Sequence, residues 1–317
     1  MRAVVTGGCG FIGSGVVKHL MEDGWDVIVI DNFYDGRIRN LPSVKQGTLQ
    51  ILPIDVCDMA ELYGPGFNNI DWIFHIAGHY ANIRSLLEPM LNIKTNMMGT
   101  MAALMFARNH NVKNFMYASS SGVYGAMDVV AYAENSQPKP STPYECTKYA
   151  GETLCCGWGE IYKMSIVSPR FFNVYGPGDV PGEYRAVIPN FFRKALRGEE
   201  IHITGERASR DFTYIDDVVN AILAGVNRAM EMPGLELVYN IATGRETFIV
   251  KLAEQIISMC ESQSELIISE KRDWDNALRR VGDVHKFRAL FPQEAASMRL
   301  VEDGLRACSV WYKEVCR

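Results

Sequence analysis

The chain has 317 residues, 48% hydrophobic and 22% charged, which is ordinary for a soluble globular protein with a substantial core. A net charge of −5 without any basic run argues against nucleic acid and anionic membranes as partners, and no apolar run approaches the ~18 residues of a membrane span. The eight cysteines contain no CxxC pair, so we expect a cytoplasmic protein with no zinc site, no other bound metal and no disulfide framework.

The first 31 residues predict one βαβ unit. In chain order it consists of an apolar strand over residues 2–6, a tight turn with Gly7, Gly10 and Gly13, a helix over 11–21 and a strand over 27–30. Glycines at a helix N-terminus let backbone N–H groups approach a pyrophosphate. Such glycines also occur in ordinary turns, but the flanking strands and the following Asp31 favour dinucleotide binding. Asp31 would accept hydrogen bonds from two ribose hydroxyls and repel a 2′-phosphate, so NAD is predicted over NADP.

Strand and helix signals alternate after this unit, which predicts a Rossmann-type, doubly wound parallel sheet with helices on both faces. Further strands are expected at 49–55, 71–78, 114–119, 164–170, 201–204 and 238–242, and helices at 89–109, 144–162, 188–197, 249–260 and 302–311. We expect residues 1–172 to form the NAD-binding domain, with segments near 213–243 returning to it. Residues 173–317 should form most of a smaller, interleaved α/β substrate lobe.

Tyr144 and Lys148 stand four residues apart at the start of an expected helix, so both project from one face. A free tyrosine has a pKa near ~10, but a neighbouring ammonium and the positive nicotinamide ring favour its phenolate. The pair would form a general base that takes a proton from a sugar hydroxyl while hydride leaves for NAD. Such pairs are common on ordinary helices, but the preceding strand ends in Ser119, Ser120 and Ser121, and one serine could share the hydrogen bond to the reacting oxygen.

Several motifs occur in the order and spacing of the extended short-chain dehydrogenase/reductases. They are TGGCGFIGS, IDNFYDG, FHIAG, YASSSGVYG, YECTK, PRFFNVYGPG and RDFTYIDDV. Over nearly its whole length the chain most resembles the NAD-dependent nucleotide-sugar epimerases and dehydratases, of the UDP-glucose/galactose 4-epimerase type.

The resemblance implies a role for each matching residue. Ser120, four positions before Tyr124, is implied as the catalytic serine, Tyr144 as the base, and Lys148 as its partner and a ribose ligand. The implied cofactor positions are Gly7, Gly10, Phe11, Ile12, Gly13, Asp31, Asn32, Asp55, Val56, Ala77, Tyr144, Lys148 and Phe171. The implied substrate positions are Ser121, Asn173, Arg210 and Arg280, and Asn96 matches a structural asparagine near the active site.

Two of these substrate positions have alternative interpretations. Asn173 could only cap a turn, and Arg210, implied as the diphosphate-binding arginine, could instead pair with Asp211 or Asp217. The segment with Arg279–Arg280 is shorter than in the galactose epimerases, so its register, and with it the assignment of Arg280, stays open.

The expected function is epimerisation of a nucleotide-diphosphate sugar, with a UDP-sugar as the first choice, at C4 through a transient 4-keto intermediate. A 4,6-dehydratase or a decarboxylase would share the first oxidation, and a non-catalytic NAD sensor would need no base. The two residues after Ser120 are Ser121 and Gly122, where the resembling dehydratases carry Asp and Glu. Elimination of water would therefore need a carboxylate from elsewhere in this chain.

Two further features bear on partners. Arg84 lies where the family varies, and it could contact an acidic sugar or only solvent. The methionine-rich segment 97–105 reads as a core helix, but the resemblance implies that the equivalent helix forms a four-helix homodimer interface.

Overall fold

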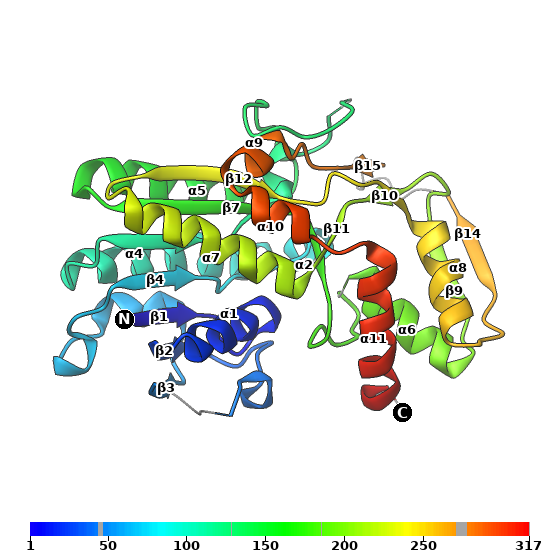
Figure 1. Cartoon of the computed structure of the whole chain (residues 1–317), viewed down its shortest axis with the longest axis horizontal. Helices are drawn as coiled ribbons and strands as arrows, with labels where there is room; N and C mark the ends of the chain where they lie inside the picture. Colours follow the sequence, from blue (N-terminus) through cyan, green and yellow to red (C-terminus); the bar gives the residue numbers. More distant parts are fainter. Residues whose placement is uncertain (44–46, 128, 185, 271–277, 317) are drawn as a thin grey trace. The chain divides into compact units, whose positions relative to one another are not determined.

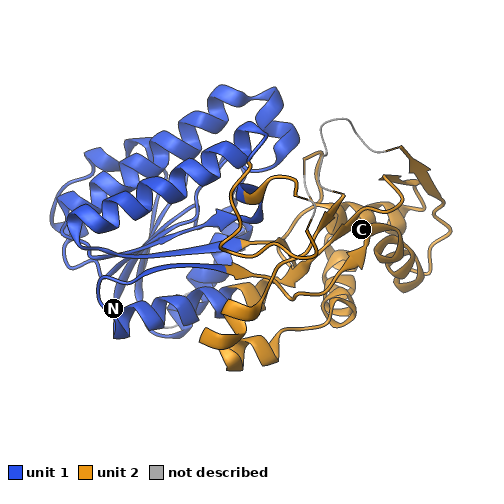
Figure 2. Cartoon of the chain, turned by 90° about the horizontal axis from the view of Figure 1, so that it is seen from above, with its two compact units in different colours: residues 1–123, 140–170, 219–239 blue, residues 124–139, 171–218, 240–317 orange. Residues whose placement is uncertain are grey.

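The computed structural model describes residues 1–43, 47–127, 129–184, 186–270 and 278–316. The chain forms two compact units (Figure 2): residues 1–123, 140–170 and 219–239 make the first, and residues 124–139, 171–218 and 240–317 make the second. Each unit is therefore assembled from three separate segments. Residues 124–139, which we expected in the NAD-binding domain, pack with the second unit.

The first unit is built around a parallel sheet with strand order β12-β7-β5-β4-β1-β2-β3, and β6 pairs with β7 (Figure 1). Its elements, including those that run on into the second unit, are β1 (Arg2–Thr6), α1 (Phe11–Glu22), β2 (Asp26–Ile30), η1 (Ile38–Asn40), β3 (Leu49–Leu52), η2 (Val56–Glu61), η3 (Pro65–Phe67), β4 (Trp72–His75), α2 (Asn82–Leu87), α3 (Pro89–Ile93), η4 (Lys94–Met98), α4 (Gly99–Asn109), β5 (Asn114–Tyr117), β6 (Ser119–Ser120), η5 (Ser121–Tyr124), α5 (Pro143–Tyr162), β7 (Ser165–Phe171), α7 (Ile215–Glu231) and β12 (Glu236–Ile241).

The central strands are short apolar runs because helices cover both faces of the sheet (Figure 2). Strand β1 pairs in parallel with both β2 and β4, and the register places Thr6 beside Ile30 on one side and His75 on the other. The carboxyl ends of these three strands therefore meet at one edge of the sheet. This edge is where α/β proteins bind their ligands, and the chain's glycine turn lies there.

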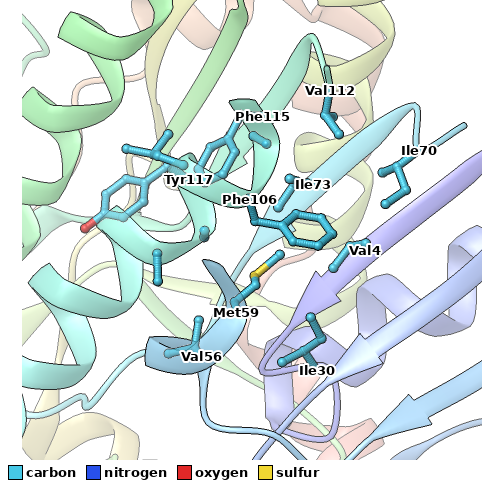
Figure 3. Packing of buried hydrophobic residues seen from close by; sticks show 14 of the residues in the cluster. Val4, Ile30, Val56, Met59, Ile70, Ile73, Phe106, Val112, Phe115 and Tyr117 are labelled. Atoms are coloured by element: carbon cyan, nitrogen blue, oxygen red, sulfur yellow. The ribbon is translucent and has the colours of Figure 1, made fainter. Parts of the chain in front are cut away.

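The core of the first unit fills one face of this sheet (Figure 3). Phe106 of α4 is fully buried among Val4, Ile73 and Met59, and its ring meets Phe67 edge-on at 5.4 Å between centroids. Burying a side chain of this size contributes about 1.5–3 kcal/mol. The packing fixes α4 on the sheet, so the loops at the carboxyl edge have a rigid support.

The helix expected over 89–109 is confirmed with these bounds, but its middle turn is not α-helical. Helix α3 runs into a π-helical segment, η4 at Lys94–Met98, and then into α4. A π turn shifts the direction of the side chains on one turn of a helix, and such turns concentrate at functional sites. Here Asn96 occupies the π segment and is buried.

The second unit contains three small sheets and five helices among its described residues: β8 (Asn173–Tyr175), α6 (Val187–Arg197), β9 (Ile201–Thr204), β10 (Ser209–Arg210), β11 (Phe212–Tyr214), β13 (Thr247–Phe248), α8 (Ile249–Met259), β14 (Leu266–Ser269), β15 (Arg279–Arg280), α9 (His285–Leu290), α10 (Pro292–Ser297) and α11 (Val301–Val315). The sheets pair β8 with β11, β9 with β14, and β10 with both β13 and β15. Most of these strands have two to four residues, too few for a periodicity to be recognised in the sequence.

Candidate active site

The glycine turn connects β1 to the N-terminus of α1. Gly7 has φ +68°, and a Cβ there would meet the backbone of Ala77 at 2.7–2.8 Å. A Cβ on Gly13 would collide with the carbonyl oxygen of Gly7, so both positions need glycine. No side chain caps the first turn of α1, where Gly10 is the N-cap residue. The turn is thus a close-approach surface lined by backbone N–H groups, which suits the diphosphate of a dinucleotide.

Asp31 directly follows β2, and its carboxylate points back toward the glycine turn. It is only 7% exposed, and it accepts hydrogen bonds from Cys9 N at 2.9 Å and from Phe33 N at 2.8 Å. A carboxylate has about four lone-pair sites, so two remain for ribose hydroxyls. The backbone hydrogen bonds hold this acceptor in place before any ligand binds.

Next to Asp31, Asn32 donates to Asp55 Oδ2 at 3.0 Å. Burial raises the pKa of Asp55, but hydrogen bonds from Cys57 and Asn32 outweigh it and leave the pKa below its usual value. Val56 begins η2, and its side chain is buried in the hydrophobic core of the first unit. The Asn32–Asp55 pair joins the loops after β2 and β3 at the edge of the sheet.

Phe11, Ile12 and Ala77 complete the residues expected around the cofactor in this unit. Phe11 and Ile12 form the start of α1 and are half-buried. Ala77 follows β4, and its N–H donates to Thr6 Oγ1 at 3.2 Å. The glycine turn and the loops after β2, β3 and β4 therefore bring these expected cofactor residues to one sheet edge.

The helix that carries Tyr144 and Lys148 starts at a complete capping box. Thr142 Oγ1 accepts from Glu145 N at 3.3 Å, and the Glu145 carboxylate accepts from Thr142 N at 3.3 Å. The helix dipole and the cap fix the first turn of α5, on which Tyr144 lies half-buried.

Ser120 and Tyr144 both lie beside Gly122. Ser120 Oγ accepts a hydrogen bond from Gly122 N at 3.0 Å. A Cβ on Gly122 would sit 3.2 Å from Ser120 Oγ and 3.5 Å from Tyr144 Cε1. The structure thus brings the serine hydroxyl and the tyrosine ring close to the same glycine, while Ser121 is buried.

Lys148 is buried, one helical turn beyond Tyr144. Its Nζ donates to the carbonyl oxygen of Ala118 at 2.8 Å and lies 5.2 Å from the centroid of the Tyr117 ring. Burial lowers the pKa of Lys148 to about 8. The amine is therefore still mostly protonated at neutral pH.

A buried amide network that we did not predict supports this helix face. Asn96 Oδ1 accepts from His79 N at 2.7 Å, and Asn96 Nδ2 donates to Thr147 Oγ1 at 3.0 Å. Thr147 Oγ1 in turn donates to Asn92 Oδ1 at 2.9 Å. Asn92 and Asn96 are four residues apart in the expected helix, and this spacing was the available signal. The network ties α5 to the loop after β4.

Phe171, Asn173, Arg210 and Arg280, the other expected site residues, lie in the second unit. Parallel pairing of β10 with β15 puts Arg210 directly beside Arg280, and Arg280 Nη2 donates to Gly125 O at 3.1 Å. Asn173 Nδ2 donates to the carbonyl oxygen of Asp211 at 3.2 Å. Two guanidinium-bearing residues are therefore held next to each other on neighbouring strands.

Arg210 had an alternative interpretation, in which it pairs with Asp211 or Asp217. The hydrogen bonds of these two carboxylates bear on that alternative. The Asp211 carboxylate accepts from Thr243 N at 2.9 Å and from Gly244 N at 2.8 Å, and Asp217 Oδ2 accepts from Arg299 N at 2.8 Å. The carboxylates proposed as partners for Arg210 thus serve backbone groups.

Arg279 and Arg280 have different partners within the second unit. Arg279 Nε donates to Glu246 Oε1 at 2.7 Å. Arg280 is in register with Arg210 on the neighbouring strand, and its guanidinium donates to the backbone of Gly125. The charge of Arg279 is thus matched by a carboxylate of the second unit.

None of the helices in the described part of the chain is long and apolar enough to cross a bilayer. Among the same residues, no group of three or more His, Cys, Asp or Glu side chains is placed to hold a metal ion.

A parallel sheet with a glycine turn, an acidic residue after the second strand and a serine–tyrosine–lysine cluster is typical of dinucleotide-dependent enzymes of the extended short-chain dehydrogenase/reductase class. Residues 3–242 match the NAD dependent epimerase/dehydratase family. The chain belongs to this family, which confirms the resemblance, the fold class and NAD as the cofactor.

Three similar proteins show the range of the family. A UDP-N-acetyl-alpha-D-glucosaminuronate decarboxylase of Bacillus cytotoxicus is 30% identical, over 99% of this chain and 98% of its own. The structure of a UDP-glucose 4-epimerase of Thermotoga maritima with UDP-glucose is 30% identical, covers 100% of both chains and has a TM-score of 0.89. That of a Thermus thermophilus UDP-glucose 4-epimerase complex with NAD is 26% identical over 99% of each chain, with a TM-score of 0.85.

Proposed function

We propose that the protein interconverts two UDP-sugars by NAD-dependent epimerisation at C4, through a transient 4-keto sugar. The observation that carries this proposal is the surroundings of Gly122. This residue lies against Ser120 and Tyr144, and it has no side chain to act as a second acid or base. Removal and return of hydride at one carbon needs a single proton-transfer group, whereas elimination of water needs two.

The nearest carboxylate, Glu145, is occupied by structural hydrogen bonds. Its Cγ would lie 3.2 Å from a Cβ on Gly122, but the carboxylate accepts from Ser141 N at 2.9 Å, from Thr142 N at 3.3 Å and from Asn82 Nδ2 at 3.3 Å. A buried group that completes a helix cap is poorly placed to exchange protons with a substrate. This argument supports epimerisation over dehydration.

In the proposed mechanism the chain's own residues bind the ligands and move one proton. The glycine turn and Asp31 hold the cofactor, whose chemistry when bound is reversible hydride acceptance. Tyr144 removes the proton of the 4-hydroxyl as general base and returns it, and Ser120 shares the hydrogen bond to the reacting oxygen. The Lys148 ammonium favours the Tyr144 phenolate and binds the ribose.

Arg210 and Arg280 are proposed to bind the diphosphate of the sugar nucleotide. Two guanidinium groups on adjacent strands provide several donors for phosphate oxygens in a fixed arrangement. Asn173 is proposed to face the sugar nucleotide, Phe171 the nicotinamide and Ser121 the sugar.

A decarboxylase is the second candidate, because the Bacillus cytotoxicus relative is one. Such an enzyme needs a cation for the substrate carboxylate, and Arg84 was the residue considered for an acidic sugar. In the structure Arg84 is buried, its Nη1 pairs with Asp35 at 2.7 Å and its Nε pairs with Glu88 at 3.3 Å. Two carboxylates already neutralise this cation, which weighs against decarboxylation.

A homodimer is proposed from the apolar surface over α2 to α4. Leu87, Met90, Ile93 and Met98 are all exposed on these consecutive helical segments. Side chains of this kind are expected to pack against the same helices of a second copy. Met90→Lys should then give a monomer in size-exclusion chromatography with light scattering, and an unchanged mass would contradict this interface.

The proposed function is tested by incubating the purified protein with a panel of nucleotide sugars. Chromatography and mass spectrometry should find an isomer of unchanged mass for a UDP-sugar. A product lighter by one water would favour the dehydratase, and one lighter by carbon dioxide the decarboxylase. Binding of NAD without turnover on any sugar would favour the non-catalytic sensor.

A further inference from the structure

A buried ion pair lies directly behind the proposed catalytic residues. Arg170 Nη2 donates to Glu152 Oε1 at 2.5 Å and Arg170 Nε to Glu152 Oε2 at 3.1 Å. Ser119 Oγ donates to the same Glu152 Oε2 at 2.6 Å. The Arg170 and Glu152 side chains are 6% and 5% exposed, and Ser119 is 2% exposed.

The Glu152 carboxylate links α5 to β6, the two elements that carry the proposed catalytic residues. Tyr144, Lys148 and Glu152 follow one another at intervals of four on α5, so they share a face of the helix. Ser119 and Ser120 are the two residues of β6, so fixing Ser119 also fixes the backbone that carries Ser120. Anchoring Ser119 to Glu152 therefore holds the strand from which the half-buried Ser120 hydroxyl reaches Gly122, beside the Tyr144 ring.

Arg170 connects the Glu152 carboxylate to a third element, strand β7. It lies near the end of β7, the strand that pairs with β6. The bidentate fork leaves Glu152 no rotational freedom, so the acceptor for Ser119 is fixed relative to both the sheet and α5.

Stability alone does not account for this arrangement. A buried ion pair is often no more stabilising than apolar residues of the same volume, and positional specificity is its better-supported use. The hydrogen bond from Ser119 to a carboxylate is of the strong, charge-assisted kind. Displacing a reacting group by ~1 Å can reduce turnover ~100-fold, so an anchor one residue from Ser120 has a direct effect on rate.

We propose that Glu152 and Arg170 are positioning residues, which act through Ser119 to set the Ser120 hydroxyl in line with Tyr144 and Lys148. The proposal rests on the proposed function, because it assigns the reacting oxygen to the space between Ser120 and Tyr144. The three residues touch neither substrate nor cofactor themselves.

Ser119→Ala tests the proposal, because it removes one hydroxyl and leaves the Glu152–Arg170 pair intact. We expect kcat to fall about tenfold, with KM for the sugar nucleotide and the NAD content unchanged. Ser168→Ala is the matched control: Ser168 is a fully buried serine of β7 whose Oγ has no hydrogen-bond partner. This control should keep wild-type kcat.

A double-mutant cycle with Ser120→Ala separates positioning from a structural role. If Ser119 acts through Ser120, adding Ser119→Ala to Ser120→Ala should change kcat less than about twofold. Two results would overturn the proposal. One is that the two substitutions reduce kcat additively. The other is that Ser119→Ala raises KM and lowers both the NAD content and the thermal stability. Wild-type protein without turnover on any nucleotide sugar would refute the proposed function instead, so the two failures are distinguishable.

Discussion

Replacing Lys148 with methionine should remove activity and at the same time stabilise the protein at neutral pH. Lys148 is buried, and burial lowers its pKa from 10.5 to about 8. That difference corresponds to roughly 3 kcal/mol of unfavourable free energy for the buried ammonium. Loss of the hydrogen bond to Ala118 O offsets about 2 kcal/mol of this, so the net gain should be on the order of 1 kcal/mol.

The gain should depend on pH in a defined direction. Below about pH 8 both the folded and the unfolded wild type carry the Lys148 proton, and the full cost of the buried charge applies. Between about pH 8 and 10.5 the folded state has lost this proton while the unfolded state still binds it, so wild-type stability rises relative to the variant. The advantage of Lys148→Met should therefore shrink across this window.

Chemical denaturation of the cofactor-free proteins, followed by circular dichroism between about pH 7 and 10.5, measures this difference. Lys18→Met is the matched control, because Lys18 is exposed on α1 and its replacement should give no such pH-dependent gain. The reasoning would be refuted if the wild type were more stable than Lys148→Met at pH 7. It would also be refuted if the difference in their free energies of unfolding did not change with pH. Turnover by the variant should fall, and what remains should need a higher pH, because the ammonium no longer favours the Tyr144 phenolate.

Three further predictions concern the other candidate residues. Tyr144→Phe should leave folding and NAD binding nearly intact but reduce turnover by ~10²–10⁴, and a variant that keeps most of its activity would show that another group is the base. Calorimetry should find tighter binding of NAD than of NADP, and Asp31→Ala should reduce this difference in affinity. Equal affinities in the wild type would contradict the role of Asp31. Arg210→Ala should raise KM for the sugar nucleotide far more than it weakens NAD binding, whereas Arg207→Ala, from the preceding loop, should change neither; equal loss of both ligands would disprove the diphosphate role.

The part of the fold with strong local signals could be predicted from the sequence. The first strand was expected over residues 2–6 and is Arg2–Thr6, because an apolar run ends there at a glycine turn. The helix after the turn was expected to end one residue before Glu22, its observed end. These elements depend on residues close in the chain, so periodicity and glycine placement suffice.

The features that were missed depend on contacts between distant residues. The π segment contains Asn96, whose side chain bonds to residues 17 and 51 positions away. The pairing of Arg210 with Arg280 joins two-residue strands, far apart in the chain, that have no signature of their own. Motif spacing could identify Ser120, Tyr144 and Lys148 as candidates, but it could not reveal the Glu152 anchor, because Ser119 and Arg170 are 33 and 18 residues away from it.

The most direct test of hydride removal and return at one carbon is the reaction in deuterated water, with the product analysed by proton NMR and mass spectrometry. The account predicts an epimer that carries no solvent deuterium on sugar carbon, since the hydride is held on the cofactor and only the hydroxyl proton exchanges through Tyr144. The cofactor should be recovered as NAD. A product lighter by one water or by carbon dioxide would contradict the account, and deuterium on a sugar carbon would instead indicate epimerisation by proton abstraction next to a keto group.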